Sequence, residues 1–193
     1  MTSTNRALVP PYVASLRPYV AGRSPEEVAA TYSLSRVVKL SSNENPLGAS
    51  PLALARMRES LDQLNRYPTG LDLRGCLAEK FGTKIDNVVT GSGSESIMAN
   101  IVRTFLSDQD EALTSAGTFM GFEILARGRG IPIRTVPLRQ DWHIDLEALA
   151  LAINERTKII YLANPNNPTG TIFTKQEFDA FYKHVPPHVL IIL

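Results

Sequence analysis

Two stretches of this sequence hold polar groups in a pattern that could bind a small molecule. The first, Asn164-Pro165-Asn166-Asn167-Pro168-Thr169-Gly170, directly follows the apolar run 158–163. Its prolines and final glycine continue neither a strand nor a helix, and the two prolines restrict the backbone so that the amides between them point in a fixed direction. A plain tight turn is the alternative. Because ligands bind beyond the carboxyl ends of strands in open α/β sheets, we expect an amide-lined binding loop here.

The second stretch is rich in glycine and serine. Gly91-Ser92-Gly93-Ser94-Glu95-Ser96 lies between a predicted strand over 87–90 and a predicted helix with an apolar face from Ile97 to Phe105. Free amides at a helix N-terminus carry partial positive charge, and glycine lets a phosphate approach closely. A dinucleotide-binding loop would need glycine in place of Ser96, and no Gly-Lys-Ser/Thr follows to make a P-loop. The stretch therefore predicts a phosphate site, with a capped helix start as the alternative.

A third polar loop, residues 41–48, precedes another predicted helix. Ser50 as its cap and Pro51 at its first position indicate where this helix begins. Its apolar face carries Leu54, Met57, Leu61 and Leu64. Capping explains Ser50 and Pro51 but not Asn43-Glu44-Asn45. Polar loop residues that turn chemistry does not explain are more often functional, so this segment is a candidate for a substrate pocket, and a simple connector is the alternative.

The elements that must position these loops alternate along the chain. Strands are predicted over 37–40, 87–90, 111–114, 133–136, 158–163 and 189–193. Helices are predicted over 25–31, 51–64, 119–127 and 146–153, around Leu73 to Phe81, and after a capping box at 174–177. Such alternation predicts a three-layer α/β fold with a mostly parallel sheet and right-handed crossovers, in which the last strand is covered on both faces.

Composition narrows the class of partner. The chain has 193 residues, of which 44% are hydrophobic and 20% charged, and its net charge is +1, so neither nucleic acid nor an anionic membrane is expected. One cysteine excludes an internal disulfide, and the three histidines have no metal-ligand spacing. No apolar run approaches the roughly 20 residues of a membrane span, and no signal peptide is evident. We expect a cytoplasmic protein that binds a small molecule and no metal.

The ordered motifs resemble those of the pyridoxal-phosphate aminotransferases of fold type I, from about residue 12 to the last residue. In N-P-x-N-P-T-G, the family's Asn before Pro-Thr-Gly hydrogen-bonds the ring hydroxyl of the cofactor, which implies this role for Asn167. The family's phosphate cup, G-x-G-S-[DE], implies that the amides of Ser94 and Glu95 bind the cofactor phosphate. Arg66-Tyr67-Pro68 resembles R-Y-P, whose tyrosine reaches the cofactor phosphate of the other subunit, so the likeness implies a homodimer in which Tyr67 crosses the interface.

Two further likenesses concern the ring and the substrate. The segment 118–122 resembles T-[FY]-x-x-[YF], which implies that Phe122 stacks on the pyridine ring, and core packing is the alternative. Asn43-Glu44-Asn45-Pro46 resembles the substrate-side loop of the histidinol-phosphate aminotransferases. This likeness implies pyridoxal 5'-phosphate as cofactor and, as reaction, transamination between histidinol phosphate or a similar amino donor and a 2-oxo acid such as 2-oxoglutarate, in histidine biosynthesis.

The resemblance also implies what the chain lacks. The lysine that forms a Schiff base with the cofactor and the Asp that pairs with the pyridine nitrogen are expected beyond Leu193, so no catalytic residue is predicted here and the chain alone is expected to be inactive. We expect residues 1–50 to form an arm and part of the small domain, and 51–193 to form the N-terminal portion of a large domain incomplete at its C-terminus. The alternatives are a lyase or decarboxylase of the same fold, similar to threonine-phosphate decarboxylase, and a non-catalytic truncated gene product.

Overall fold

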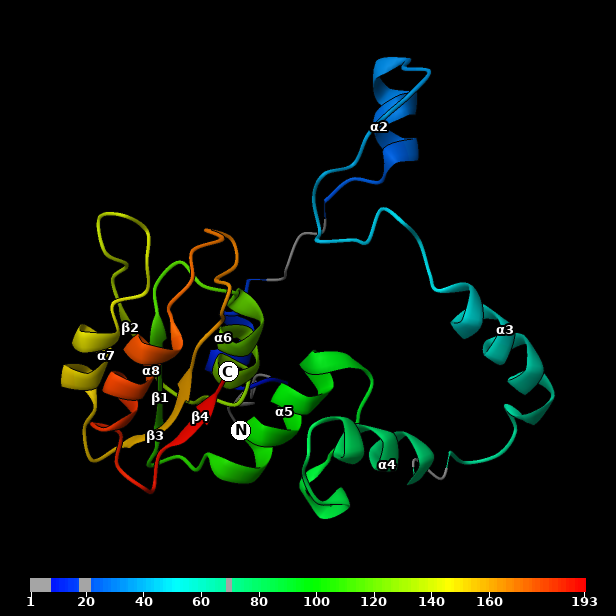
Figure 1. Cartoon of the computed structure of the whole chain (residues 1–193). Helices are drawn as coiled ribbons and strands as arrows, with labels where there is room; N and C mark the ends of the chain where they lie inside the picture. Colours follow the sequence, from blue (N-terminus) through cyan, green and yellow to red (C-terminus); the bar gives the residue numbers. More distant parts are fainter. Residues whose placement is uncertain (1–7, 18–21, 69–70) are drawn as a thin grey trace, which may run out of the picture. The chain divides into compact units, whose positions relative to one another are not determined.

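The computed structural model describes residues 8–17, 22–68 and 71–193, and Figure 1 shows its helices and strands. The chain divides into two units. The larger unit combines the described residues up to Leu16 with Gly82–Leu193, and the smaller unit is Arg17–Phe81. Parts of the predicted N-terminal arm, residues 1–7 and 18–21, lie outside the described residues. The division into 1–50 and 51–193 stays a prediction.

A parallel sheet forms the centre of the larger unit. Its strands are β1 (Glu111–Ser115), β2 (Ile133–Val136), β3 (Thr157–Tyr161) and β4 (Leu190–Ile192). They lie in the order β2-β1-β3-β4, and each neighbouring pair is parallel. The sequence prediction of a mostly parallel α/β sheet is confirmed.

Helices connect the strands and cover both faces of this sheet. They are α5 (Gly93–Phe105), which leads into β1, α6 (Met120–Arg127), α7 (Leu146–Ala152) and α8 (Lys175–Tyr182). Successive side chains of a strand point to opposite faces, so neighbouring residues of β1 and β3 enter different cores. Leu113 and Ile160 pack with α7 and α8, whereas Ala112 and Ile159 pack with α5 and α6. The result is the predicted three layers.

Several helix starts agree with their sequence signals. Thr174 and Glu177 form a reciprocal capping box at α8, and Asp145 accepts a hydrogen bond from the Ala148 amide at 2.9 Å at the start of α7. In the smaller unit, Ser24 and Glu27 form the same kind of box at α2 (Pro25–Tyr32). Each box satisfies amides that the helix cannot satisfy itself, which is why these starts were predictable.

Other elements differ from the prediction. No strand forms over 37–40 or 87–90; residues 85–87 instead make the short 3-10 helix η2 (Ile85–Asn87). A strand exists only through hydrogen bonds to a neighbour, and neither segment joins the described sheet. The strand predicted over 189–193 is shorter, and β4 is half-buried at the sheet edge instead of covered on both faces.

The smaller unit is helical and largely exposed. Besides α2 it contains α3 (Pro51–Ser60), the 3-10 helix η1 (Leu61–Gln63) and α4 (Leu71–Lys80). Pro51 occupies the first turn of α3 as predicted, but Ser50 makes no side-chain cap. The predicted apolar face of this region is solvent-exposed: Leu54, Met57, Leu61 and Leu64. Periodicity identified the helix but not what covers it.

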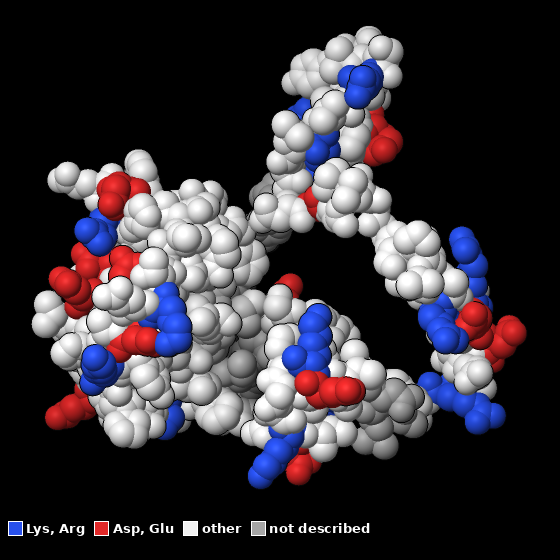
Figure 2. Space-filling view, viewed as in Figure 1, with Lys and Arg blue, Asp and Glu red and all other residues white. Residues whose placement is uncertain are grey.

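Charges of both signs are interspersed on the face seen in Figure 2. This agrees with a net charge of +1. The exposed ion pairs Arg127–Glu123, at 2.7 Å, and Lys175–Asp179, at 2.5 Å, each join residues four apart on one helix. Such pairs stabilise a helix only slightly.

A polar network closes the amino edge of the sheet. Glu111 in β1 is nearly buried, and its Oε1 accepts hydrogen bonds from Arg134 Nη2 in β2 at 2.8 Å and from Thr157 Oγ1 in β3 at 3.0 Å. Arg134 also donates to the carbonyl of Ala152 at the end of α7. The Glu111 carboxylate therefore connects β1, β2 and β3, and the guanidinium of Arg134 connects β2 to the end of α7.

We predict that Glu111→Ala lowers the free energy of unfolding by about 2 kcal/mol, because it leaves Arg134 without its charge partner in a half-buried position. Urea unfolding measures this loss. The matched control is Glu123→Ala, which removes an exposed ion pair and should cost less than about 0.5 kcal/mol. Equal losses for the two variants would contradict a special role of the Glu111 network.

Candidate functional site

The carboxyl ends of β1 and β3 lie next to each other. These strands pair in parallel with Thr114 opposite Tyr161, so the loops that follow them begin at the same edge of the sheet. The loop after β1 includes Gly117 and Thr118, and the loop after β3 includes the asparagine-rich segment 164–170. The predicted binding loop therefore lies where open α/β sheets bind ligands.

Asn166 is fully engaged within the protein. The residue is only 3% exposed. Its Oδ1 accepts a hydrogen bond from Thr118 Oγ1 at 2.8 Å, and its Nδ2 donates to the Gly117 carbonyl at 3.1 Å and to Thr169 Oγ1 at 2.8 Å. No hydrogen atom of this amide remains for a ligand. Asn166 instead joins the two loops.

Asn164 is also engaged, whereas Asn167 is not. The Asn164 amide donates to the Phe173 carbonyl at 3.0 Å and accepts from the Phe173 amide at 3.1 Å, which closes the base of the loop. Asn167 is half-buried, and no described residue hydrogen-bonds its side chain. The peptide bonds before Pro165 and Pro168 are cis. Of the three amides in this loop, the one predicted to contact a ligand is the one left available.

The structure contradicts the prediction for Phe122. This side chain is 0% exposed, and its ring stacks on Tyr161 with centroids 4.8 Å apart and planes 10° apart. Phe122 and Ala126 share the buried face of α6, so the ring belongs to the core. Burial also raises the pKa of the Tyr161 hydroxyl. The four-residue spacing of Phe122 and Ala126 places both on one face of the helix, and this spacing is the sequence signal for a core position at residue 122.

The aromatic ring at the sheet edge is that of Phe119. It precedes α6 and is 39% exposed. A Cβ on Gly121 would lie 2.4 Å from Phe119 Cε1, so the ring rests directly on the Gly121 backbone. Phe119, and not Phe122, therefore offers an exposed aromatic surface on which a flat ring could stack.

The glycine-rich stretch begins a helix earlier than predicted. α5 starts at Gly93, and Ser94 and Glu95 occupy its exposed first turn. Ser92 makes no side-chain cap, and the first amides of a helix have no partner within it. α5 ends close to the amino end of β1 and runs back from there, so its N-terminus faces away from the amino edge (Figure 1). The arrangement fits a phosphate site at the Ser94 and Glu95 amides.

The remaining predicted residues lie in the smaller unit. Glu44 forms an ion pair with Lys39 at 2.7 Å. The Asn45 side chain accepts from the Leu47 amide at 3.0 Å and donates to the Gly48 carbonyl at 3.2 Å, so turn chemistry explains Asn45 after all. Asn43 has a positive φ of 51°. Tyr67 is 98% exposed, which leaves its side chain available to a partner.

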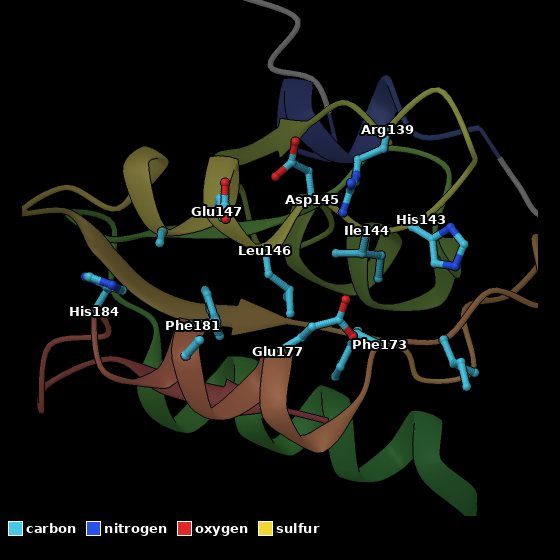
Figure 3. A pocket seen from close by; sticks show the side chains of 13 residues that line it. Arg139, His143, Ile144, Asp145, Leu146, Glu147, Phe173, Glu177, Phe181 and His184 are labelled. Carbon is cyan, nitrogen blue, oxygen red and sulfur yellow. The ribbon is translucent and has the colours of Figure 1, made fainter.

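Sequence reasoning did not identify the hollow between α7 and α8 (Figure 3). Its volume is about 370 Å³, and its lining includes Arg139, His143, Asp145, Glu177 and His184. Two of its acids already serve as helix caps. Hydrogen bonds from the Thr174 backbone and hydroxyl, together with the nearby positive charge of Arg139, hold the pKa of Glu177 below its usual range. Asp145 and Glu177 are therefore engaged in helix capping.

Residues 35–193 match the family model of aminotransferase class I and II. The chain belongs to this family. It is 45% identical over 188 residues to a histidinol-phosphate aminotransferase of Anaeromyxobacter sp. (strain Fw109-5), covering 96% of this chain and 52% of that protein. It is 42% identical over 180 residues to a histidinol-phosphate aminotransferase of Bacillus velezensis, covering 92% and 50%.

A solved structure is also similar to this aminotransferase chain. The crystal structure of histidinol-phosphate aminotransferase from Sinorhizobium meliloti in complex with pyridoxal-5'-phosphate superimposes with a TM-score of 0.82 at 28% identity, covering 97% of this chain and 50% of that one. The predicted fold of the type I aminotransferases is confirmed. The chain spans about half the length of these relatives. Within the described residues, no cluster of His, Cys, Asp or Glu could hold a metal, and no helix could cross a membrane.

Phe119, which precedes α6, and Phe122, within α6, should respond differently to substitution by alanine. We predict that Phe122→Ala lowers the free energy of unfolding by about 3–5 kcal/mol, because it leaves a cavity under Tyr161. Phe119→Ala should cost less than about 1 kcal/mol, because its ring is largely at the surface. Urea unfolding of both variants measures the difference. A larger loss at residue 119 than at 122 would reverse our assignment of core and edge.

Proposed function

We propose that the protein to which this chain belongs is a pyridoxal-phosphate-dependent aminotransferase that uses histidinol phosphate and a 2-oxo acid such as 2-oxoglutarate. The observation that carries this proposal is the available amide of Asn167, which follows the two engaged asparagines Asn164 and Asn166 in the same loop. The family and the names of the relatives at 45% and 42% identity support the reaction and the histidine-biosynthetic role. Such an enzyme works in the cytoplasm.

The exposed groups of the larger unit fit the chemistry of pyridoxal 5'-phosphate. A flat ring needs an aromatic face, which Phe119 offers at the carboxyl edge. Its ring hydroxyl needs a donor, which Asn167 supplies, and its phosphate needs amides at a helix start, which Ser94 and Glu95 supply. When bound, the cofactor supplies an electron-accepting ring that stores charge during proton removal from the substrate. The role of these residues is to bind and orient it.

The lysine that holds the cofactor and the Asp that pairs with its ring nitrogen belong, in this proposal, to the length of the relatives that this chain does not span. No lysine of the chain lies in the sequence context expected for that role. The residues described here then bind and orient the cofactor, and proton transfer is the task of the remaining part.

The smaller unit contributes the substrate loop and the subunit contact in this proposal. Asn43 and Glu44 face the substrate, whereas Asn45 shapes the turn that presents them. Tyr67, at 98% exposure, reaches the cofactor phosphate of the second subunit of a homodimer. The exposed apolar side chains of α3 support a partner surface in this unit.

The reaction is tested in the full-length protein with histidinol phosphate and 2-oxoglutarate, by following glutamate formation. Glutamate that appears only with both substrates supports the proposal. Release of carbon dioxide or an elimination product without consumption of the 2-oxo acid would indicate a decarboxylase or lyase of the same fold. No turnover with bound cofactor would indicate a non-catalytic relative.

We predict that Asn167→Ala in the full-length protein weakens cofactor retention by roughly 10- to 100-fold and shifts the absorbance of the bound cofactor, because a hydrogen bond to a charged oxygen contributes about 1.5–3 kcal/mol. Equilibrium dialysis and absorbance spectra measure both effects. The matched control is Asn154→Ala, which removes an amide before β3, at the amino edge of the sheet. Unchanged affinity and spectrum in Asn167→Ala would assign this residue to the turn alone.

A further inference from the structure

Asn166 and Thr118 form a direct link between the loops after β1 and β3. The two side chains meet at 2.8 Å, and Asn166 also donates to the Gly117 carbonyl at 3.1 Å. The carbonyl fixes the orientation of the amide, because only the Nδ2 end can face it. The link joins residues that are 48 positions apart in the sequence. It is partly buried, since Asn166 is only 3% exposed.

The position of this link along the chain is informative. Thr118 directly precedes Phe119, the exposed aromatic ring, and Asn166 directly precedes Asn167, the available amide. Any change in the distance between Thr118 and Asn166 therefore moves the ring and the amide relative to each other. Among the described residues, the Asn167 side chain has no hydrogen bond of its own that would resist that change.

We infer that Asn166 and Thr118 are positioning residues that set the spacing between the Phe119 ring and the Asn167 amide, and so the slot for a flat heteroaromatic phosphate ester. The inference rests on the proposed function. A flat ring that stacks on one group and hydrogen-bonds another through its edge needs both at a fixed separation. The clamp of Thr118 and Asn166 supplies this separation before the cofactor binds.

The same network extends to a third loop. Thr169 Oγ1, which accepts from Asn166, lies 2.8 Å from Thr171 Oγ1, and Thr171 donates to the Trp142 carbonyl at 3.0 Å. Backbone hydrogen bonds from Gly170 N to Asn166 O at 2.7 Å and from Asn166 N to Thr171 O at 2.8 Å close the loop around the clamp. Both the side chain and the backbone of Asn166 are therefore hydrogen-bonded, and a residue that positions two ligand contacts needs to be fixed in this way.

Thr114 provides a matched control for Thr118. Its Oγ1 donates to the Tyr161 carbonyl at 2.8 Å, so it too links β1 with β3 through one threonine hydroxyl, but inside the sheet. Thr118→Val and Thr114→Val each remove one such bond while keeping the side-chain shape. Thr118→Ser keeps the hydroxyl and serves as the conservative variant.

The first experiment measures cofactor affinity in the full-length protein by titration with pyridoxal 5'-phosphate, together with the thermal unfolding midpoint. We expect Thr118→Val to bind pyridoxal 5'-phosphate about tenfold more weakly than Thr114→Val, with similar unfolding midpoints for the two variants. Thr118→Ser should keep the wild-type affinity, because serine retains the hydroxyl. A purely structural role would give equal affinities in the two valine variants. That result would overturn the inference.

The second experiment uses the protein without cofactor, so that it separates this inference from the proposed function. Hydrogen–deuterium exchange is followed in peptides covering 116–119 and 164–170. We expect Thr118→Val to speed exchange in both loops together and Thr114→Val in neither. Acceleration in only one loop would show that the clamp does not couple them. If the wild-type protein binds no pyridoxal 5'-phosphate, the proposed function fails, and exchange alone still decides whether the clamp exists.

Discussion

The parallel pairing of β1 with β3 is the constraint on which the site depends. It aligns Thr114 with Tyr161, and the Thr114 hydroxyl adds a buried hydrogen bond to the Tyr161 carbonyl. The loops that follow β1 and β3 therefore leave the sheet at the same edge. Without this alignment, residues 48 positions apart in sequence could not meet as Thr118 and Asn166 do.

The two edges of the sheet differ in how they use their polar groups. At the amino edge, Glu111 is shared between Arg134 and Thr157, and every one of these groups is engaged internally apart from Arg134 Nε. At the carboxyl edge, Asn166 is engaged in the same way, but it stands beside Asn167, which is not. An edge that is satisfied internally stabilises the fold, and an edge that leaves one amide available can bind a ligand.

The sequence predicted the parts of this structure that local chemistry determines. Capping boxes at Ser24 and Thr174 satisfy amides within a few residues, so their helices could be located without tertiary information. The alternation of strands and helices from residue 111 onward was sufficient for the parallel sheet. The choice of Asn167 came from a motif. The hydrogen bonds of Asn164 and Asn166 leave its amide available, and its contact with a ligand stays a prediction.

The failures share a different cause, since each depended on contacts between distant residues. The segments 37–40 and 87–90 were predicted as strands, but neither of them joins the described sheet. Phe122 was chosen from a motif with two aromatic positions, and the packing of α6 on Tyr161 shows that the second of them is in the core. The clamp of Asn166 carries no sequence signal, because its partners are set by strand register.

The contact between Phe119 and Gly121 links two positions that a motif treats as separate. Because a Cβ at residue 121 would come within 2.4 Å of the ring, any larger residue there displaces the aromatic side chain. In directed evolution of the start of α6, a randomised position 121 would yield functional clones mainly in combination with a new residue at 119. The two codons are therefore best varied in one library, since a library of position 121 alone keeps the ring of Phe119 in place and would report position 121 as intolerant.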